Sequence, residues 1–252
     1  MSTNQEITRK TIVITGTSRG IGNSLANTFL DQGYRVIGIS RSDTDIQDPN
    51  FRYIQTDMAD LDQVAKLKLA LRSESITGLI NNAGTHGPIG ALENCSIEKW
   101  VDTFSANLFG HTLLSQICIP ALRKSKGFVI FMSGGGSAFP RPNFSAYSVS
   151  KTGIVRLSEI LAQELAPEIL VYCVAPGPNK TGLLKEAIDH GEIVPKQDIV
   201  DFDYVSNLCL FLSGNRDSRY SGKFIHVKDN YLEWTDKNLT GDGYTLRRIK
   251  IT

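Results

Sequence analysis

The sequence predicts an α/β protein with a doubly wound parallel sheet of about seven strands, helices on both faces and a single domain. Three observations predict this class. Short apolar, β-branched runs alternate with amphipathic segments, which is the pattern of β-α-β units. A glycine-rich turn follows the first of these runs. No repeat or change of composition divides the 252 residues, a length that long α/β sheets reach as one domain.

The first β-α-β unit is the clearest. Residues 11–15 are a β-branched run that breaks into a turn with the spacing Gly-x-x-x-Gly-x-Gly. An amphipathic helix is expected over 23–32, with Gly33 as its stop signal, and a second strand over 34–39. The crossover between these strands should be right-handed.

The glycine turn has the chemistry of a dinucleotide site. Gly16 permits the tight turn, Gly20 lets a pyrophosphate approach the backbone, and Gly22 allows close packing of helix and strand. The helix that follows presents free N–H groups to the phosphates. A tight βα loop with no ligand can carry the same glycines. In a Rossmann-type unit the turn residues that contact the cofactor are expected to be Gly16, Ser18, Arg19, Gly20, Ile21 and Gly22.

The end of the second strand bears on the choice of cofactor. An acidic residue there would bind the ribose 2′-hydroxyl of NAD, whereas an arginine can accept the 2′-phosphate of NADP. Arg41 occupies this place, and Arg19 in the glycine turn is a second cation within reach. We therefore expect NADP. Asp43 and Asp45 follow shortly afterwards and keep NAD open.

The rest of the chain supplies the other elements. Further strands are expected over 51–56, 78–80, 127–132, 169–174 and 222–227. Helices are expected over 61–72, 97–122, 145–164 and 203–212. The segment of about 178–200 is charged and irregular, which is the composition of a mobile lid.

Tyr147 and Lys151 form a candidate acid–base pair. On a helix, residues four apart share one face. An ammonium held beside a phenol lowers the phenol pKa, and such a phenol can exchange a proton with a carbonyl or an alcohol. A solvated helix face accounts for most isolated Tyr-x-x-x-Lys pairs, so the pair carries weight only in the context of the other motifs.

Taken together, the motifs resemble the classical short-chain dehydrogenase/reductase family. In chain order they are Thr15-Gly-x-x-x-Gly20-x-Gly22, Asp57, Asn81-Asn-Ala-Gly84, Asn107, a serine after the fifth strand, Tyr147-x-x-x-Lys151, and Pro176-Gly177 with Thr181. The resemblance implies that Tyr147 is the general acid/base and that Ser133 orients the carbonyl. Lys151 would lower the Tyr147 pKa and bind the nicotinamide ribose, and Asn107 would bend its helix and hold a water in a proton relay.

The resemblance also assigns the cofactor contacts. Asp57, with Met58 beside it, would touch the adenine. Asn81, Ala83 and Gly84 would line the adenosine side and the central loops. The nicotinamide would be held by Pro176, Gly177 and Thr181.

Two departures from the family pattern stand out. The catalytic serine commonly lies thirteen residues before the tyrosine, where this chain has Gly134. A one-residue insertion would restore Ser133 to the role, which leaves Ser137 outside it. The end of the chain, about 228–252, is also atypical, and it resembles the tails of members linked to surface-polysaccharide or nucleotide-sugar pathways.

The expected function is therefore an NADP(H)-dependent oxidoreductase that transfers a hydride between nicotinamide and a carbonyl or secondary alcohol, with a sugar or nucleotide-sugar as one substrate class. The alternative is a non-catalytic dinucleotide-binding regulatory protein, since fold alone does not separate the two. An epimerase or dehydratase of the extended branch is disfavoured by chain length and glycine spacing. The residues expected to wall the substrate site are His86, Phe139, Arg141, Phe144, Lys180 and Lys185. The sign of the charge that the lid presents to a substrate stays open, because acidic residues lie near these cations: Glu186, Asp189 and Glu192.

Composition limits the partners. A net charge of +1 gives no reason to expect a nucleic acid or a membrane surface. There is no run of 18 apolar residues, no visible secretory signal, and no metal-ligand spacing among the four cysteines, which are expected to be buried thiols. We expect a cytoplasmic protein that acts on small molecules.

The resemblance further implies a homodimer built on the helices that carry Asn107 and Tyr147, or a homotetramer that also uses the final strand and the end of the chain. The apolar residues expected to form this interface are Trp100, Phe104, Leu108, Leu113 and Ile117 on the first helix, and Val155, Ile160 and Leu161 on the second.

Overall fold

The computed structural model describes residues 9–194 and 196–246. Within them, seven parallel strands form one sheet in the order β3-β2-β1-β4-β5-β6-β7. The strands are β1 (Thr11–Thr15), β2 (Arg35–Ser40), β3 (Phe51–Gln55), β4 (Ile76–Asn81), β5 (Phe128–Met132), β6 (Leu170–Ala175) and β7 (Phe224–His226). The strand order reverses between β1 and β4. In open α/β sheets, ligands bind outside the carboxyl ends of the strands at such a reversal.

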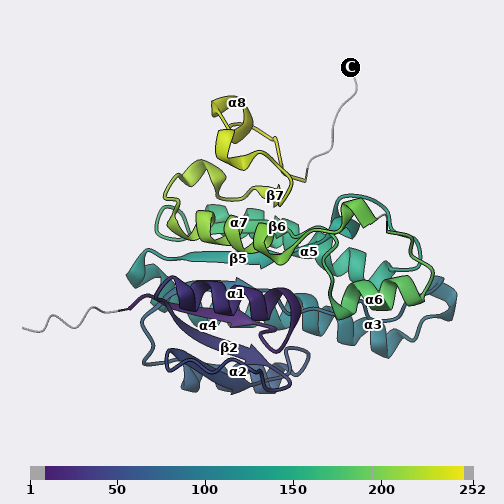
Figure 1. Cartoon of the computed structure of the whole chain (residues 1–252), viewed down its shortest axis with the longest axis horizontal. Helices are drawn as coiled ribbons and strands as arrows, with labels where there is room; N and C mark the ends of the chain where they lie inside the picture. Colours follow the sequence, from purple (N-terminus) through teal and green to yellow (C-terminus); the bar gives the residue numbers. More distant parts are fainter. Residues whose placement is uncertain (1–8, 195, 247–252) are drawn as a thin grey trace, which may run out of the picture.

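Helices cover both faces of the sheet (Figure 1). One face carries α1 (Gly20–Asp31) and α7 (Phe202–Gly214). The other carries α2 (Leu61–Ala70), α4 (Gly110–Ser125) and α5 (Ser145–Glu164). The predicted doubly wound α/β fold is confirmed.

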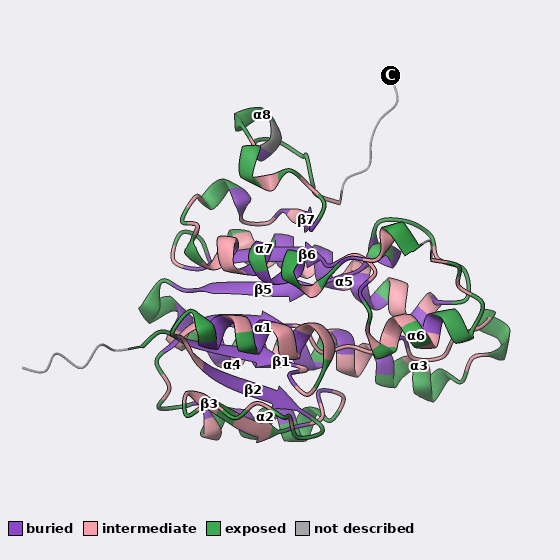
Figure 2. Ribbon diagram, viewed as in Figure 1, coloured by how far each residue is buried: buried purple, intermediate pink, exposed green. Residues whose placement is uncertain are grey.

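The strands are buried on both sides, and the two cores alternate along them. In β1, Ile12 and Ile14 point into the core under α1 and α7, whereas Val13 points into the core under α2, α4 and α5. This alternation follows from the two-residue period of a strand. Figure 2 shows the central strands almost entirely buried, which explains why they read as continuous apolar runs.

The helix expected over 97–122 is interrupted. It comprises α3 (Ile97–Phe104), a π-helical turn over Ser105–Phe109, and then α4. The side chain of Asn107 explains the interruption, because its amide accepts from the Thr85 backbone N–H (2.9 Å) and donates to the Thr85 carbonyl (2.9 Å). A π turn of this kind is often found at a functional site.

The segment expected to be an irregular lid contains a helix, α6 (Gly182–Asp189). Thr181 caps it by accepting a hydrogen bond from the Leu184 N–H at 3.2 Å. Leu183, Leu184 and Ala187 are spaced so that they form one apolar face of a helix. The high charge of the segment predicted an irregular structure because it gives no information about this spacing. Figure 1 shows α6 beside α3, at one end of the molecule.

The end of the chain packs beside β7. The Phe224 N–H donates to the Tyr244 carbonyl at 2.7 Å, and the Lys223 ammonium donates to the carbonyls of Gly241 and Gly243. Trp234 packs against the ring of Tyr244, with centroids 4.2 Å apart. This part of the tail, with the short helix α8 (Asp236–Leu239), therefore covers the outer edge of the sheet (Figure 1). The last part of the expected tail, 247–252, lies outside the described residues.

Two expectations about burial need correction. Val155 is fully buried among α4, β5 and β6 side chains, so it has no surface to offer a second subunit. Cys95 is half-buried, whereas Cys118, Cys173 and Cys209 are buried as expected, and all four are free thiols. Among the described residues, no helix is both long enough and apolar enough to cross a bilayer.

Candidate active site

One large cavity, about 1530 Å³, opens at the carboxyl ends of the strands. It runs from the glycine turn, past the ends of β2, β4 and β5, to α6. A volume of this size exceeds that of an ordinary drug-sized pocket and has room for a dinucleotide together with a second molecule.

The glycine turn forms the backbone cradle that its spacing predicts. Gly16 and Gly20 have φ values of +78° and +62°, which favour glycine. At Gly22 a side chain is excluded, because a Cβ there would lie 2.2 Å from the Gly16 carbonyl oxygen. No side chain caps the N-terminus of α1, so its first N–H groups face the cavity free for an anion.

Most of the predicted cofactor residues line this cavity. They are Gly16, Ser18, Arg19, Gly20, Ile21, Arg41, Asp57, Met58, Ala83, Gly84, Tyr147, Lys151, Pro176, Gly177 and Thr181. Gly22, Asn81 and Asn107 do not line it. Gly22 acts through packing, as the spacing predicts.

Asn81 differs from its expected role. Its side chain is fully buried on the far side of the strand end, where its amide donates to Ser115 Oγ at 3.0 Å. The neighbouring Asn82, which the sequence reasoning missed, lines the cavity instead. The Asn82 amide donates to the Thr15 carbonyl at 2.9 Å and so ties the end of β4 to the glycine turn. Successive side chains of a strand point to opposite faces of the sheet, and this alternation was the signal in the sequence that could have distinguished the two asparagines.

Asn107 lies behind the cavity wall rather than in it. Besides its two bonds to Thr85, its amide donates to Ser150 Oγ at 3.0 Å on α5. A Cβ added to Gly84 would lie 3.3 Å from both Asn107 Oδ1 and Lys151 Nζ. Asn107 therefore holds the loop after β4 against α5, next to the lysine, which is a positioning role.

Tyr147 and Lys151 share the buried face of α5, as their spacing predicts. The Lys151 ammonium is 3% exposed and donates to the Met132 carbonyl at 2.8 Å. Burial lowers the pKa of Lys151 to about 8. Burial raises the pKa of Tyr147 above its ordinary value, and the charge that opposes this is on Arg141. The predicted lowering of the Tyr147 pKa by Lys151 is therefore not found, because the Lys151 ammonium donates to a carbonyl of β5.

Ser133 lines the cavity, and its hydroxyl has two partners in the protein. Ser133 Oγ donates to the Lys151 carbonyl at 3.2 Å and lies 2.9 Å from Ser137 Oγ, so its hydroxyl is engaged with α5 and the adjoining turn. The residue that faces the phenol is Gly134, where an added Cβ would lie 2.2 Å from Tyr147 Oη. The backbone of residue 134 thus occupies the place beside the phenol that a serine thirteen residues earlier would fill.

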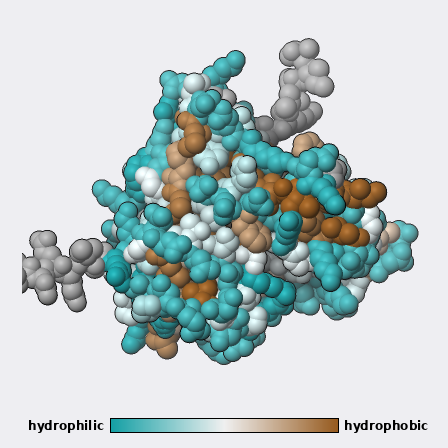
Figure 3. Space-filling model, viewed as in Figure 1, coloured by the Kyte–Doolittle hydropathy of each residue, from teal (hydrophilic) through white to brown (hydrophobic). Residues whose placement is uncertain are grey.

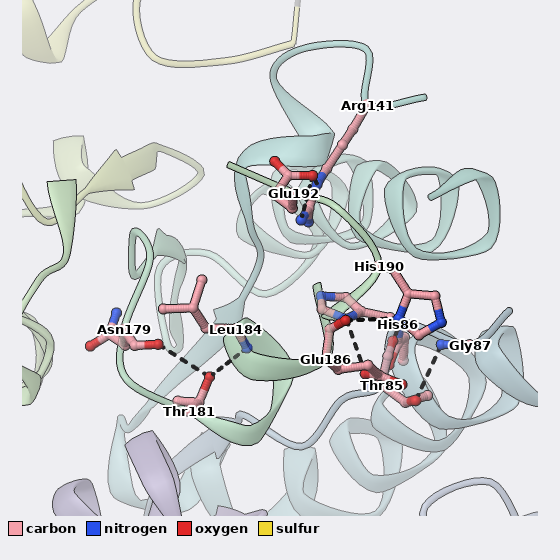
Figure 4. A network of polar contacts seen from close by, with 11 residues as sticks. Thr85, His86, Gly87, Arg141, Asn179, Thr181, Leu184, Glu186, His190 and Glu192 are labelled. Carbon is pink, nitrogen blue, oxygen red and sulfur yellow. Dashed lines mark hydrogen bonds and ion pairs between the residues drawn. The ribbon is translucent and has the colours of Figure 1, made fainter. Parts of the chain in front are cut away.

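Two polar contacts join the 178–200 segment to the opposite wall of the cavity (Figure 4). Glu186 of α6 reaches His86 Nδ1 at 3.1 Å, and Glu192 reaches Arg141 at 3.3 Å. The His86 ring packs edge-on against Tyr147, with centroids 4.9 Å apart. Burial, and then the positive charge of Arg141, lower the pKa of His86 to about 4. A neutral His86 therefore donates from Nδ1 to the Glu186 carboxylate.

The other expected substrate residues divide in two. Phe139 and Lys180 line the cavity with His86 and Arg141, whereas Phe144 is buried beneath Arg141 and Lys185 lies outside the wall. Apolar side chains that the sequence did not single out also line it: Leu183, Leu184, Ile193 and Val194. Figure 3 shows apolar atoms gathered at the surface over this end of the molecule.

Asn179 is a further polar residue at the cavity. It is 3% exposed, and its amide donates to the carbonyls of Pro176 and Gly177. Its Oδ1 is buried and has no hydrogen-bond partner among the residues that the structure describes. A buried unpaired oxygen costs about 1–3 kcal/mol, and a donor from a bound molecule would satisfy it. This orphaned acceptor, the glycine cradle and the cavity volume all fit a dinucleotide.

Comparison with known proteins decides the family. The model of the short chain dehydrogenase family matches residues 10–191, which is most of the chain. The chain belongs to the short-chain dehydrogenase family. It is thus an NAD(P)-dependent dehydrogenase or reductase that acts on small molecules, in agreement with the prediction from its motifs.

Similar proteins agree with this assignment. An uncharacterized oxidoreductase of Schizosaccharomyces pombe is 29% identical over 251 residues, covering 88% of this dehydrogenase and 98% of the relative. A benzil reductase of Saccharomyces cerevisiae is 29% identical, with coverage of 70% and 74% respectively. The ligand-free structure of an aldohexose dehydrogenase from Thermoplasma acidophilum superposes with a TM-score of 0.79 at 27% identity, covering 87% of this chain and 92% of that one.

Proposed function

We propose that this dehydrogenase transfers a hydride between NADP(H) and a carbonyl or secondary-alcohol substrate, with Tyr147 as the group that moves the proton. One observation carries the proposal: the glycine cradle for a dinucleotide and the Tyr147–Lys151 pair open into the same cavity. A sensor of the cofactor would need only the first of these. Two of the similar proteins are named for reactions of this kind, the benzil reductase for a reduction and the aldohexose dehydrogenase for an oxidation.

Bound nicotinamide supplies or accepts the hydride. In reduction, the hydroxyl of Tyr147 donates its proton to the substrate oxygen, and Arg141 stabilises the resulting phenolate through its charge. Lys151, whose ammonium donates to the Met132 carbonyl on the same cavity wall, would bind the nicotinamide ribose. Since the Ser133 hydroxyl is engaged with the Lys151 carbonyl and Ser137, orienting the carbonyl by Ser133 requires its Oγ to rotate toward the cavity that it lines.

NADP is proposed over NAD because two arginines, Arg19 and Arg41, line the end of the cavity beyond β2. Arginine suits a 2′-phosphate through its planar, bidentate donors. Asp57 and Met58 line the same cavity, and we propose that they contact the adenine.

Assembly as a homodimer, in the cytoplasm, is part of the proposal. Apolar side chains remain exposed on α3, on the π turn and on α5, and they include Val101, Phe109, Val149 and Ile160 at 45–51% exposure. A second subunit would cover them. The tail beside β7 covers the other edge that a tetramer would use, so we propose a dimer rather than a tetramer.

The test is turnover of NADPH with a panel of ketones, aldehydes and sugars, for the wild-type protein and for Tyr147→Phe. The variant should bind NADPH normally but lose at least about 100-fold in kcat, the scale of general acid–base catalysis. Binding of NADPH with no turnover by the wild-type protein on any compound would favour the regulatory alternative. Turnover that survives in Tyr147→Phe would refute the role of the phenol.

A further inference from the structure

Arg141 is held in a fixed place close to the reacting centre. It lies in the loop between β5 and α5, and its guanidinium sits 3.7 Å from the centre of the Phe144 ring and 5.9 Å from that of Tyr147. Phe144 is 3% exposed and the Arg141 side chain 23% exposed. Stacking on a buried aromatic ring orients the planar guanidinium and leaves its edge for hydrogen bonding.

The edge of Arg141 already contacts a carboxylate. Glu192 Oε2 lies 3.3 Å from both Nε and Nη2 of Arg141 (Figure 4). Charge-assisted N–H···O pairs are usually about 2.7–2.9 Å long, and an arginine–carboxylate pair commonly uses two oxygens. The contact is longer than that and uses one oxygen for both nitrogens. Glu192 is itself on the cavity wall, in the segment after α6. A carboxylate of a bound molecule can therefore replace it with better geometry.

Apolar residues adjoin Arg141 and Glu192 in the chain and line the same cavity. They are Phe139 and Ile193, which are 75% and 90% exposed, together with Pro140 and Val194. The lysines that line the cavity other than Lys151 are exposed: Lys99, Lys180 and Lys228. Among the described residues that line the cavity, Arg141 is thus, apart from Lys151, a cation that is partly sheltered from water and close to Tyr147.

We propose that Arg141 binds an anionic group, a carboxylate or a phosphate, on the substrate, and that Glu192 is the internal carboxylate which this group displaces. The short separation of Arg141 and Tyr147 places the anionic group a few bonds from the carbonyl. The substrates are then short oxo acids or oxo phosphates, or the corresponding hydroxy compounds. This inference rests on the proposed oxidoreductase function and names the substrate class of that site.

The experiment measures kcat/KM with NADPH for matched pairs of substrates. The pairs are 2-, 3-, 4- and 5-oxo acids against their methyl esters, and dihydroxyacetone phosphate against dihydroxyacetone. A charge-assisted hydrogen bond predicts at least about a tenfold preference for the anionic member of one set. The oxo-acid set and the phosphate set distinguish the two sources of negative charge.

Variants separate recognition from support of the fold. Arg141→Gln should slow both members of a pair, because the charge beside the phenol is gone, and should in addition abolish the preference by raising KM for the anionic member. Glu192→Gln should lower that KM, because the competing carboxylate is gone. Lys180→Gln is the matched control for loss of a cavity cation and should keep the preference. If Arg141 only fastened the segment that carries Glu192, Arg141→Gln would slow both members of a pair equally.

Each result has one meaning. Equal kcat/KM for anionic and neutral members in the wild-type protein, or an unchanged ratio in Arg141→Gln, overturns the inference. Turnover of the general ketone and sugar panel without turnover of any anionic compound also overturns it but leaves the proposed function standing. Absence of turnover on every panel contradicts both.

Discussion

Replacing Lys151 by methionine should make the ligand-free protein more stable at neutral pH while it abolishes catalysis. Lys151 is 3% exposed, and its ammonium donates a hydrogen bond to the Met132 carbonyl. Burial lowers its pKa from 10.5 to about 8. At 1.36 kcal/mol per unit, keeping the proton at pH 7 costs the folded state about 3 kcal/mol. Methionine is similar in size and carries no charge.

Part of this gain is lost with the hydrogen bond. Leaving the Met132 carbonyl without the Lys151 donor costs about 1–3 kcal/mol. We therefore expect Lys151→Met to raise the free energy of unfolding by up to about 2 kcal/mol at pH 7. Lys68, exposed on α2, provides the control, since Lys68→Met removes a lysine without removing a buried charge.

The pH dependence gives a sharper test. Because the pKa of Lys151 is lower in the folded state, the unfolded chain binds more protons between about pH 8 and 10.5. The wild-type protein thus gains stability over this window relative to the methionine variant, by about 2 kcal/mol between pH 7 and 9.5. Urea unfolding without cofactor at both pH values measures the two differences. A variant less stable than wild type at pH 7, with a difference that does not change by pH 9.5, would refute the reasoning.

Two further predictions concern the cofactor and the phenol. Arg41→Asp should weaken NADPH binding and strengthen NADH binding, because a carboxylate repels a 2′-phosphate and accepts from a 2′-hydroxyl. The ratio of the two Kd values, measured by fluorescence titration, should shift at least about tenfold. An unchanged ratio would show that Arg41 does not contact the 2′-phosphate. Gly134→Ala should lower kcat about 100-fold, because the added Cβ would displace the Tyr147 hydroxyl. Gly135→Ala is the control and should remain active in the same assay, since a Cβ there meets nothing within 4 Å. Equal activities of the two variants would contradict the close approach of residue 134 to the Tyr147 hydroxyl.

The strands and the glycine turn could be predicted because local sequence determines them. A β-branched run that breaks into Gly16 and Gly20 has few structural solutions, and both glycines adopt the positive φ that favours them. The Tyr147–Lys151 pair was likewise predictable from helical spacing. These features depend on residues close together in the chain.

The details that escaped prediction depend on which way a side chain points. Asn81 and Asn82 are adjacent, yet one faces Ser115 in the core and the other faces the cavity. Ser133 and Gly134 divide in the same manner at the end of β5. Val155 lies on the buried side of α5, although its helix also carries the exposed Ile160. A single register step exchanges these faces, and tertiary packing fixes the step.

Transfer of deuterium tests the central claim most directly. The protein is incubated with NADPH that carries deuterium at C4 of the nicotinamide and with the carbonyl panel, and the products are examined by mass spectrometry. The proposed function predicts an alcohol with one deuterium on the former carbonyl carbon, formed by the wild-type protein and reduced at least about 100-fold in Tyr147→Phe. Binding of the labelled cofactor with no deuterium in any product, or equal labelling by the two proteins, would contradict it.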